Sequence, residues 1–416
     1  MGNLSKTFGK LTIPLLVLLT ISFSVNTAAA LPGSGTKQDP WRIKSLADFN
    51  EFAADENYWD DYTRLETDVN LAGRTYPNAL IAPDTSSSDE FQGPALTGVF
   101  DGNDHKVINL TINDGEAGND YLGLFGYIDD GEVRNLGLEG GSVSGHASVG
   151  GLCGLNGGTI SNCYSTGDVN GVTTHVGGLV GWNEYGCVSN CYSTGDVKGD
   201  DCIGGLVGWN NGSVSNCHST GDVNGIGWVG GLVGENWAGS ISNCYSTGNV
   251  TGGVYVGGLV GWNDGGVSKC CFTGSVSGEF SVGGLIGSNW LAGSVSNCYS
   301  IGDVSGIDYV GGLVGWNEGG ISNCFWDTDT QTHGVTYSIG DNQGTATNVA
   351  GLPTAKMKTK STFTDAGWDF VEIWNIGENQ TYPYLRVYPA GDLNHDGRVD
   401  FFDFAIVAFH WLEGTE

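Results

Sequence analysis

Basic residues are scarce in this chain of 416 residues, where 16 lysines and arginines stand against 46 aspartates and glutamates. The resulting formal net charge of −30 repels other polyanions. We therefore expect neither nucleic acid nor an anionic membrane surface among its partners. So acidic a surface is typical of a soluble exported protein.

Long apolar runs are also scarce, because a single run of apolar and hydroxyl residues spans 11–25. It is too short to cross a bilayer, which takes about 20 residues, and no second run follows. Lys6 and Lys10 precede it, and Ala30 ends a run of three alanines. This pattern predicts a signal peptide over residues 1–30 that is cleaved after Ala30. We expect a secreted or cell-surface protein with no membrane span after cleavage.

The residues that catalysis would need are either missing or repeated in identical sequence contexts. Polysaccharide lyases of the β-helix type need a basic residue near calcium, yet 150–324 contain only Lys198 and Lys269. Glycosidases need two carboxylates in different environments, and the aspartates here recur in identical contexts. The seven histidines are scattered, without a serine or cysteine triad pattern. We expect a non-catalytic protein, with a β-helix glycoside hydrolase or polysaccharide lyase as the alternative.

What the chain has in abundance is one repeated unit, V-G-G-L-V-G-x-N followed by I/V-S-N-C-Y-S-T-G-D-V. Successive copies are 26 to 28 residues apart, and a degenerate copy precedes them at 122–126. A period this regular indicates one structural unit stacked on itself. The first glycine of each pair marks the copies: Gly150, Gly177, Gly204, Gly230, Gly257, Gly283 and Gly311.

The repeat predicts an all-β fold, a parallel β-solenoid. Apolar runs of three to five residues broken by glycine exclude helix and favour strand. Each copy contains about three such runs, so we expect three short strands per coil, about eight coils and a right-handed β-helix. A propeller is the alternative, but its blades need about 40 or more residues.

Segments outside the repeat complete the domain organisation. Residues 31–120 are expected to form an N-terminal cap with the first irregular coils, including a short helix that Ser45 caps ahead of Leu46, Phe49 and Phe52. The repeat solenoid occupies 121–326, a C-terminal cap 327–389, and a separate module 390–416.

Stacked coils place equivalent residues in columns, and one column is cysteine. Parallel side chains one coil apart leave their Cβ atoms beyond the range of about 3.5–4.5 Å that a disulfide requires. We therefore interpret the column as buried free thiols packing as small hydrophobes, with a disulfide framework as the alternative. No C-x-x-C pair supports zinc. The column consists of Cys163, Cys191, Cys217, Cys244, Cys270, Cys298 and Cys324.

Asparagine, aspartate and tryptophan form further columns. Two asparagine columns, which include Asn183 and Asn190, are expected to be structural. The aspartates, such as Asp196, are interpreted as solvated turn residues, with a calcium-bridged ridge as the alternative. The tryptophans form either packing contacts between coils or a sugar-stacking stripe, depending on whether they face inward or outward. They are Trp182, Trp209, Trp262 and Trp316.

Residues 392–403 have the pattern of a calcium-binding loop. Oxygen ligands at positions 1, 3, 5, 7, 9 and 12, with glycine at position 6, are the arrangement of an EF-hand. A helix over 400–412 should follow, so apolar around its circumference that it must dock on a partner. The predicted calcium ligands are Asp392, Asn394, Asp396, Arg398 (through its backbone carbonyl), Asp400 and Asp403.

The repeated G-L-V-G core, as at 178–181, resembles the GLUG-repeat family of bacterial secreted and surface proteins. That resemblance covers about half of the chain and implies display or adhesion more than turnover. The calcium loop is similar to one half of a type I dockerin, whose loops carry aspartate at position 12, as Asp403 does. The family implies that calcium orders the helix and that Phe401 and Phe402 help to recognise a cohesin partner. Dockerins normally carry two such loops, and this chain has one.

Together these features predict a secreted, non-catalytic solenoid that presents a surface for adhesion or assembly and docks through a calcium-dependent C-terminal module. The expected partners are a cohesin-like or cell-envelope protein and a glycan or host-surface ligand. The alternative is a glycan-binding or polysaccharide-degrading accessory of a dockerin-type extracellular system.

Overall fold

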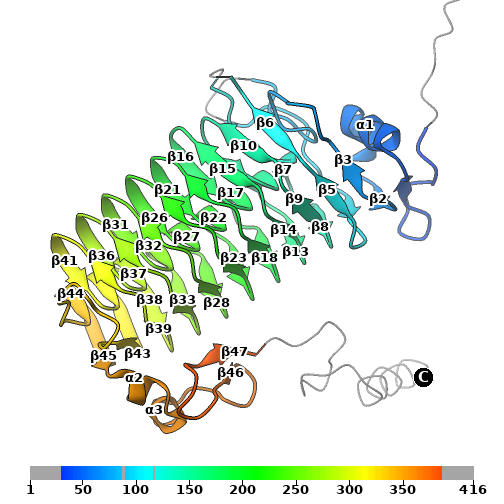
Figure 1. Cartoon of the computed structure of the whole chain (residues 1–416). Helices are drawn as coiled ribbons and strands as arrows, with labels where there is room; N and C mark the ends of the chain where they lie inside the picture. Colours follow the sequence, from blue (N-terminus) through cyan, green and yellow to red (C-terminus); the bar gives the residue numbers. More distant parts are fainter. Residues whose placement is uncertain (1–29, 87–89, 116–117, 387–416) are drawn as a thin grey trace, which may run out of the picture. The chain divides into compact units, whose positions relative to one another are not determined.

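The structure, a computed structural model, describes residues 30–86, 90–115 and 118–386. The described residues from Leu31 onward belong to one compact unit. In this unit short parallel strands stack coil upon coil (Figure 1). The prediction of an all-β parallel solenoid is confirmed, and the described residues form about nine turns.

Four parallel sheets, A to D, run along the stack; each repeat coil gives two strands to sheet A and one to each of sheets B, C and D. Sheet D consists of β11 (Val149–Gly150), β16 (Thr174–Gly177), β21 (Asp201–Gly204), β26 (Gly227–Gly230), β31 (Val254–Gly257), β36 (Phe280–Gly283) and β41 (Asp308–Gly311). Sheet C consists of β7 (Phe125–Ile128), β12 (Cys153–Asn156), β17 (Val180–Asn183), β22 (Val207–Asn210), β27 (Val233–Asn236), β32 (Val260–Asn263), β37 (Ile286–Asn289), β42 (Val314–Asn317) and β44 (Ile339–Asn342).

Sheet A bends into two files of strands. The first file is β1 (Trp41–Ile43), β2 (Tyr62–Leu65), β4 (Val99–Asp101), β8 (Glu132–Arg134), β13 (Thr159–Ser161), β18 (Cys187–Ser189), β23 (Ser213–Ser215), β28 (Ser240–Ser242), β33 (Gly266–Ser268) and β38 (Ser294–Ser296). The second is β3 (Val69–Asn70), β5 (Lys106–Ile108), β9 (Gly137–Glu139), β14 (Tyr164–Ser165), β19 (Tyr192–Ser193), β24 (His218–Ser219), β29 (Tyr245–Ser246), β34 (Cys271–Phe272) and β39 (Tyr299–Ser300). The longer strands β43 (Gly320–Asp327) and β45 (Thr345–Leu352) extend through both files.

Sheet B completes each coil and leads into sheet D of the next coil. Its strands are β6 (Thr111–Asn113), β10 (Ser142–Gly145), β15 (Asp168–Gly171), β20 (Val197–Lys198), β25 (Val223–Asn224), β30 (Val250–Thr251), β35 (Val276–Ser277) and β40 (Val304–Ser305). Equivalent residues pair across coils, as Val180 does with Val207 and Asn183 with Asn210. The repeat period is therefore the length of one turn.

A typical coil has five short strands, where the sequence predicted three. The run I-S-N-C-Y-S is broken at its asparagine, because Asn190 adopts a left-handed backbone (φ 54°) between β18 and β19. Asparagine tolerates this conformation better than most residues, so it turns the chain at this corner. The run V-G-G-L-V-G is divided between β16 in sheet D and β17 in sheet C.

One glycine of each repeat is required by the close approach of a neighbouring coil. His175 in sheet D has a left-handed backbone (φ 58°). A Cβ atom on Gly208 would lie 2.5 Å from the carbonyl carbon of His175. Any larger residue would separate the coils, so this glycine sets their spacing.

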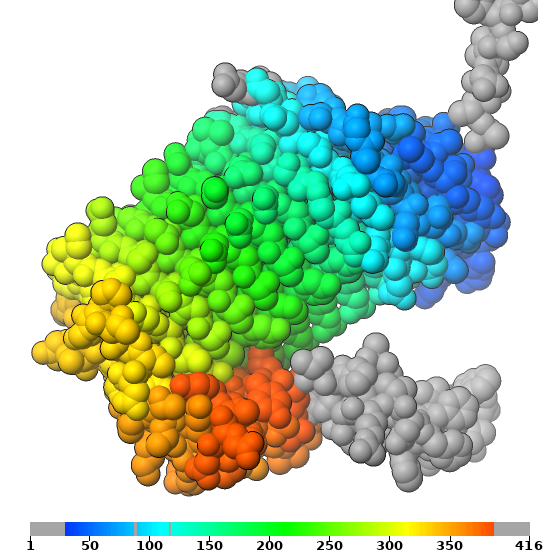
Figure 2. Space-filling view, in the orientation of Figure 1, coloured from blue at the N-terminus to red at the C-terminus, as the bar shows by residue number. Residues whose placement is uncertain are grey.

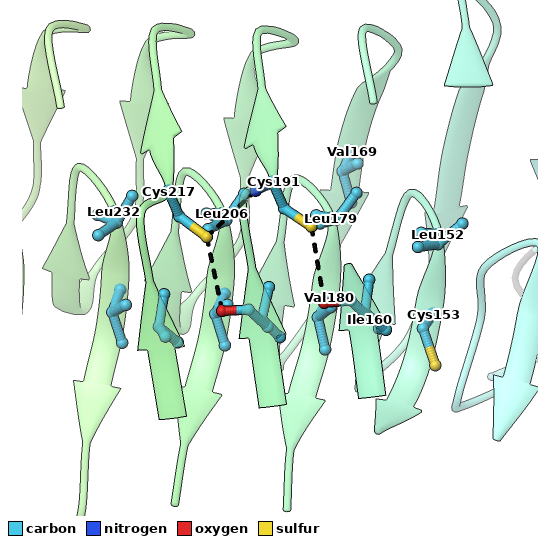
Figure 3. Close-up of a cluster of buried hydrophobic side chains, with 14 of the residues drawn as sticks. Leu152, Cys153, Ile160, Val169, Leu179, Val180, Cys191, Leu206, Cys217 and Leu232 are labelled. Atoms are coloured by element: carbon cyan, nitrogen blue, oxygen red, sulfur yellow. Dashed lines mark hydrogen bonds between the residues drawn. The ribbon is translucent and has the colours of Figure 1, made fainter. Parts of the chain in front are cut away.

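The interior is filled by rows of leucine, valine and isoleucine together with the cysteine column (Figure 3). In the second file of sheet A the buried residue is usually a serine, such as Ser193. Leu179, Leu206 and Leu232 are fully buried one coil apart. Cys191 and Cys217 lie in the same interior, beside these leucines. The core is therefore continuous along the coils, and no coil has a core of its own.

A ladder of asparagine amides, buried except at its last member Asn342, runs along the end of sheet C. Each Nδ2 donates to the Oδ1 of the next asparagine at 2.7–2.8 Å. The same amides also donate to turn carbonyls, as Asn183 does to Gly186 at 3.1 Å. The ladder consists of Asn156, Asn183, Asn210, Asn236, Asn263, Asn289, Asn317 and Asn342.

The first end of the stack is covered by helix α1 (Leu46–Ala54) and the one-turn helix η1 (Glu56–Tyr58). The backbone amide of Asp48 donates to the Ser45 hydroxyl at 3.2 Å, which is the predicted N-cap. Phe49 and Phe52 are fully buried against the first coils. The amphipathic helix thereby covers apolar residues that a bare coil would expose.

A small module follows the last coil. It contains α2 (Thr354–Met357), α3 (Lys360–Thr364) and the antiparallel pair β46 (Trp374–Asn375) and β47 (Tyr384–Leu385). Its apolar side chains form a second core against the outer side of sheet A: Met357, Phe363, Trp368, Phe370 and Trp374 with Cys271, Tyr299 and Phe325. In Figure 2 the module lies beside the last coils.

We predict that Asn236→Ala destabilises the protein by about 2–5 kcal/mol, because buried amide groups of Asn210 and Asn263 each lose a partner. Urea unfolding followed by circular dichroism measures the change. Asn216→Gly is the control, since Asn216 is exposed and its left-handed backbone (φ 54°) suits glycine. Its cost should stay below about 1 kcal/mol. Equal losses in the two variants would contradict a structural role for the buried ladder.

Candidate functional site

The predicted calcium ligands and the docking residues Phe401 and Phe402 lie outside the described residues. Among the residues that the structure describes, no group of three or more histidine, cysteine, aspartate or glutamate side chains could hold a metal ion. The calcium site therefore stays a prediction. None of the described helices is both long enough and apolar enough to span a bilayer.

The seven cysteines of the column lie one coil apart in the core, each with 0–1% of its surface exposed. The amide of Cys163 donates to the Cys191 sulfur at 3.4 Å, and the Cys163 thiol donates to the Ser161 carbonyl at 3.2 Å. All are free thiols. Burial raises the pKa of the Cys270 thiol well above its usual value. Buried thiols that are bonded to backbone carbonyls act as small hydrophobes, so the column has the chemistry of packing.

The aspartate column caps backbone groups along the outer edge of sheet B. The amide of Asp196 donates to Asp168 Oδ1 at 3.0 Å, and the amide of Asp222 donates to Asp196 Oδ1 at 3.0 Å. Where the column changes to Asn249, its amide still donates to Asp222 at 2.8 Å. Asp168, Asp196 and Asp222 are exposed and share one task, whereas Asp303 is half-buried and accepts hydrogen bonds from Thr332 and His333.

The tryptophan column lies on the outer face of sheet C, so these side chains face outward and not into the core. Trp182 pairs in register with Trp209, and both side chains are half-buried. Their rings meet edge to face at a centroid distance of 5.3 Å, beside His175. The column therefore packs coil against coil and still presents aromatic surface to solvent.

Two further tryptophans extend this surface, and sequence reasoning missed them. Trp237 and Trp290 directly follow the ladder asparagines of their coils, in turns where the other repeat copies carry glycine, asparagine or an acidic residue. Trp262 lies between them, at centroid distances of 5.5 Å from Trp237 and 6.2 Å from Trp290, with ring planes 25° and 33° apart. Trp237 is 49% exposed and Trp290 37%. Their position directly after the ladder asparagine is the sequence feature that could have predicted their place on this surface.

One carboxylate on this side is buried. Glu235 takes the tryptophan position of its coil, in register with Trp209 and Trp262. It is 8% exposed and accepts a hydrogen bond from the Cys202 thiol at 3.0 Å. Burial raises the pKa of Glu235, and hydrogen bonds from Cys202 and Trp209 partly oppose this. Among the described residues, no second carboxyl group is hydrogen-bonded to Glu235.

A groove of about 460 Å³ separates the second file of sheet A from the C-terminal module. Tyr192, His218 and Tyr245 line one side, stacked with centroid distances of 5.0 and 4.7 Å, and Ile373 and Leu385 line the other. Burial lowers the pKa of His218. Because the rings cover one another's faces, they present mainly edges to the groove.

Comparison with known families identifies the repeat. The family model described as the GLUG motif matches residues 145–170, 173–198, 199–224, 229–251 and 278–305. The chain therefore contains GLUG repeats. The intervening coil, 252–277, is not among these matches, yet its strands β31 to β35 keep the register of their neighbours.

Two curated proteins are similar over parts of the chain. "Halomucin" of Haloquadratum walsbyi is 34% identical over 160 residues, which are 38% of this chain and 2% of that protein. The "Putative Gly-rich membrane protein" of Evansella cellulosilytica is 39% identical over 84 residues, 19% of this chain and 8% of that protein. The chain thus spans only a small fraction of the length of either relative.

A solved structure also aligns with the chain, a "putative immunoglobulin A1 protease from Bacteroides ovatus". It is 20% identical, with a TM-score of 0.42 over 85% of this chain and 94% of that one.

We predict that one thiol of the eleven reacts rapidly with a thiol reagent in the native protein. Cys187 is half-buried, whereas the other ten cysteines are buried. Labelling followed by mass spectrometry should give one fast adduct on Cys187 and eleven adducts after denaturation without reductant. A denatured count below eleven would reveal disulfides and contradict the free-thiol interpretation.

We also predict that Glu235→Gln makes the protein more stable at neutral pH. The pKa of Glu235 is higher in the folded than in the unfolded protein. The stability that this shift contributes is therefore fully present below the unfolded pKa and is lost as the pH rises through the folded pKa. The glutamine variant lacks this loss. Thermal unfolding should show an advantage at pH 7 that closes below about pH 4. Glu279→Gln, at an exposed position, should show no such trend.

Proposed function

We propose that this β-solenoid of GLUG repeats is an extracellular, non-catalytic display protein that presents its coil surface for adhesion or assembly. The observation that supports the proposal is that polar groups at the same position of successive coils make the same contacts. Each aspartate of the outer column caps a neighbouring coil, and each buried asparagine bonds the next. Repetition of this kind maintains a long regular surface.

The proposed chemistry is that of binding. General acid–base catalysis needs neighbouring groups with different proton affinities, held beside a substrate. Asp168, Asp196 and Asp222 of the acidic column repeat one environment from coil to coil, and the thiols of the cysteine column are held by backbone carbonyls. The half-exposed aromatic side chains on the outer face of sheet C are instead suited to contact with a partner.

We further propose that residues 390–416 attach the protein to the cell envelope in a calcium-dependent way. The pattern of oxygen ligands from Asp392 to Asp403, followed by a strongly apolar segment, supports this. Calcium would neutralise the clustered carboxylates and allow the segment to dock on a cohesin-like or other envelope protein. Export by the N-terminal signal sequence would deliver the chain to that location.

This proposal predicts that the purified full chain sediments with native envelope fragments in calcium and is released by a chelator. Asp392→Ala with Asp396→Ala removes two of the six proposed ligands and should abolish both calcium uptake, measured by calorimetry, and sedimentation. Asp200→Ala with Asp308→Ala is the matched control, because it removes the same charge from exposed positions of the solenoid outside the aspartate column. Calcium binding unchanged in the first variant would contradict the site, and reducing ends released from polysaccharides by the purified chain would contradict the non-catalytic proposal.

A further inference from the structure

The two ends of the stack are finished differently. Helix α1 covers the first end, where Phe49 and Phe52 are fully buried against the coils. The last described coil, residues 328–352, has no such cover, because the C-terminal module packs against the outer side of sheet A. Figure 1 shows β44 and β45 as the last strands at that end.

β45 is an open edge strand. Within the described residues it pairs only with β43, and it contains neither a charged residue nor proline, which commonly protect exposed edges. The backbone amide of Thr345 donates back to the Gly319 carbonyl at 2.8 Å. Successive residues of a strand in a parallel sheet bond alternately to its two neighbours, so the amide and carbonyl of Ala346 point toward the open end. Such an edge is a template for another strand.

The last strands of sheets B and D are finished by the loop that precedes β44. Gln331 Oε1 accepts the amide of Val304 in β40 at 3.1 Å. The Tyr337 carbonyl accepts the amide of Gly312, directly after β41, at 2.8 Å. The open edge is thereby confined to sheets A and C, where β44 pairs only with β42 among the described strands.

Core positions that the earlier coils bury are open in this last coil. Val314 and Ile321 are 0% and 2% exposed. The residues stacked on them are Ile339, which is half-buried, and Ala346, which is exposed. Val349, which continues the cysteine column, is also half-buried. The end of the stack therefore combines unpaired backbone groups with an uncovered part of the core.

We propose that two copies of this chain associate end to end through this coil, around a two-fold axis that passes beside Ala346. The two Ala346 residues then form an antiparallel pair that exchanges both N–H···O bonds, and sheet A continues from one copy into the other. A two-fold contact uses the same surface on both copies, so each open core also covers the other. This inference goes beyond the proposed display function, which concerns the sides of the coils.

The size and charge of the end suit such a contact. The last coil contains 25 residues, and an interface of standard size uses about 20–30 residues a side. The net charge of −30 opposes association, but coils rise by about 4.8 Å and the Debye length is about 8 Å at physiological ionic strength. Only the charges of the last two coils therefore interact appreciably across this contact. Contact along the sides of two stacks would bring many more carboxylates together.

Two other occupants fit the observations less well. A head-to-tail arrangement would place β45 against the first end of a second copy, which α1 covers. A single extended strand from a different protein would pair with β45 and leave the half-buried Ile339 in sheet C uncovered. A second last coil matches the whole open end.

Sedimentation velocity of the full chain over a wide range of concentration tests the proposal. We expect a reversible equilibrium between monomer and dimer that persists in a chelator. X-ray scattering should show that the dimer is longer than the monomer by about one stack. Ala346→Pro removes the amide that the two copies exchange and leaves the bond from Thr345 to β43 in place. It should raise the dimer dissociation constant at least about tenfold.

Thr347→Lys is a second variant, because Thr347 is exposed in β45 and two added lysines would repel each other beside the axis. It should weaken the dimer in the same direction. Thr194→Lys is the matched control, since it adds the same charge at an exposed position between β19 and β20, in the middle of the stack. Its dimer dissociation constant should be that of the original chain. Circular dichroism checks that each variant keeps its strands, and Thr347→Lys decides alone if Ala346→Pro does not fold.

Four results would overturn the proposal. They are a chain that stays monomeric at every concentration, a dimer as short as the monomer, a dimer that Thr347→Lys leaves intact, and a dimer that a chelator dissolves. The last result would assign association to residues 390–416. Calcium-dependent sedimentation with envelope fragments should persist in both β45 variants, so failure of the dimer is distinguished from failure of the proposed function.

Discussion

In-register stacking of equivalent residues is the constraint on which the whole solenoid depends. Equivalent residues of successive coils lie in register, as Val180 does with Val207, and backbone amides donate to carbonyls of the next coil, as Val180 does to Leu206. A side chain is therefore acceptable only if it tolerates its own copy one coil above and below. Asparagine satisfies this with an amide that both donates and accepts, and cysteine does so by small size. Aspartate does so by accepting the neighbouring backbone amide, which turns a repulsive column into a set of caps.

Positions that depart from the repeat show where one coil differs structurally from the next, because all other positions make the same contacts in every coil. Cys202 and Glu235 are 33 residues apart, each replaces an aromatic residue of its neighbouring coils, and they are hydrogen-bonded to each other. Cys271 and Phe325 replace the repeated tyrosine where the C-terminal module covers sheet A. A change at one position is thus matched by a change at its contact.

Much of the fold could be predicted from the sequence, and the site much less. The period, the strand character, the capped helix at Ser45 and the asparagine ladder all follow from patterns that are local or repeated at fixed spacing. The division of each coil into five strands could not be predicted, because it depends on the left-handed backbone at positions such as Asn190 and His175. Trp237 and Trp290 were missed because they occupy turns, where periodicity gives no expectation.

The sequence by itself determined that the chain winds into parallel coils of about 27 residues, since only one turn per repeat lets every copy bury the same apolar face. It also determined which residues form columns. The tertiary structure alone decided which columns face inward. Strand alternation predicts that neighbouring side chains point to opposite faces of a sheet, but the bends between the four sheets determine which face is the core. The cysteine column and one of the two asparagine columns are thereby buried, and the tryptophans stay half open to solvent.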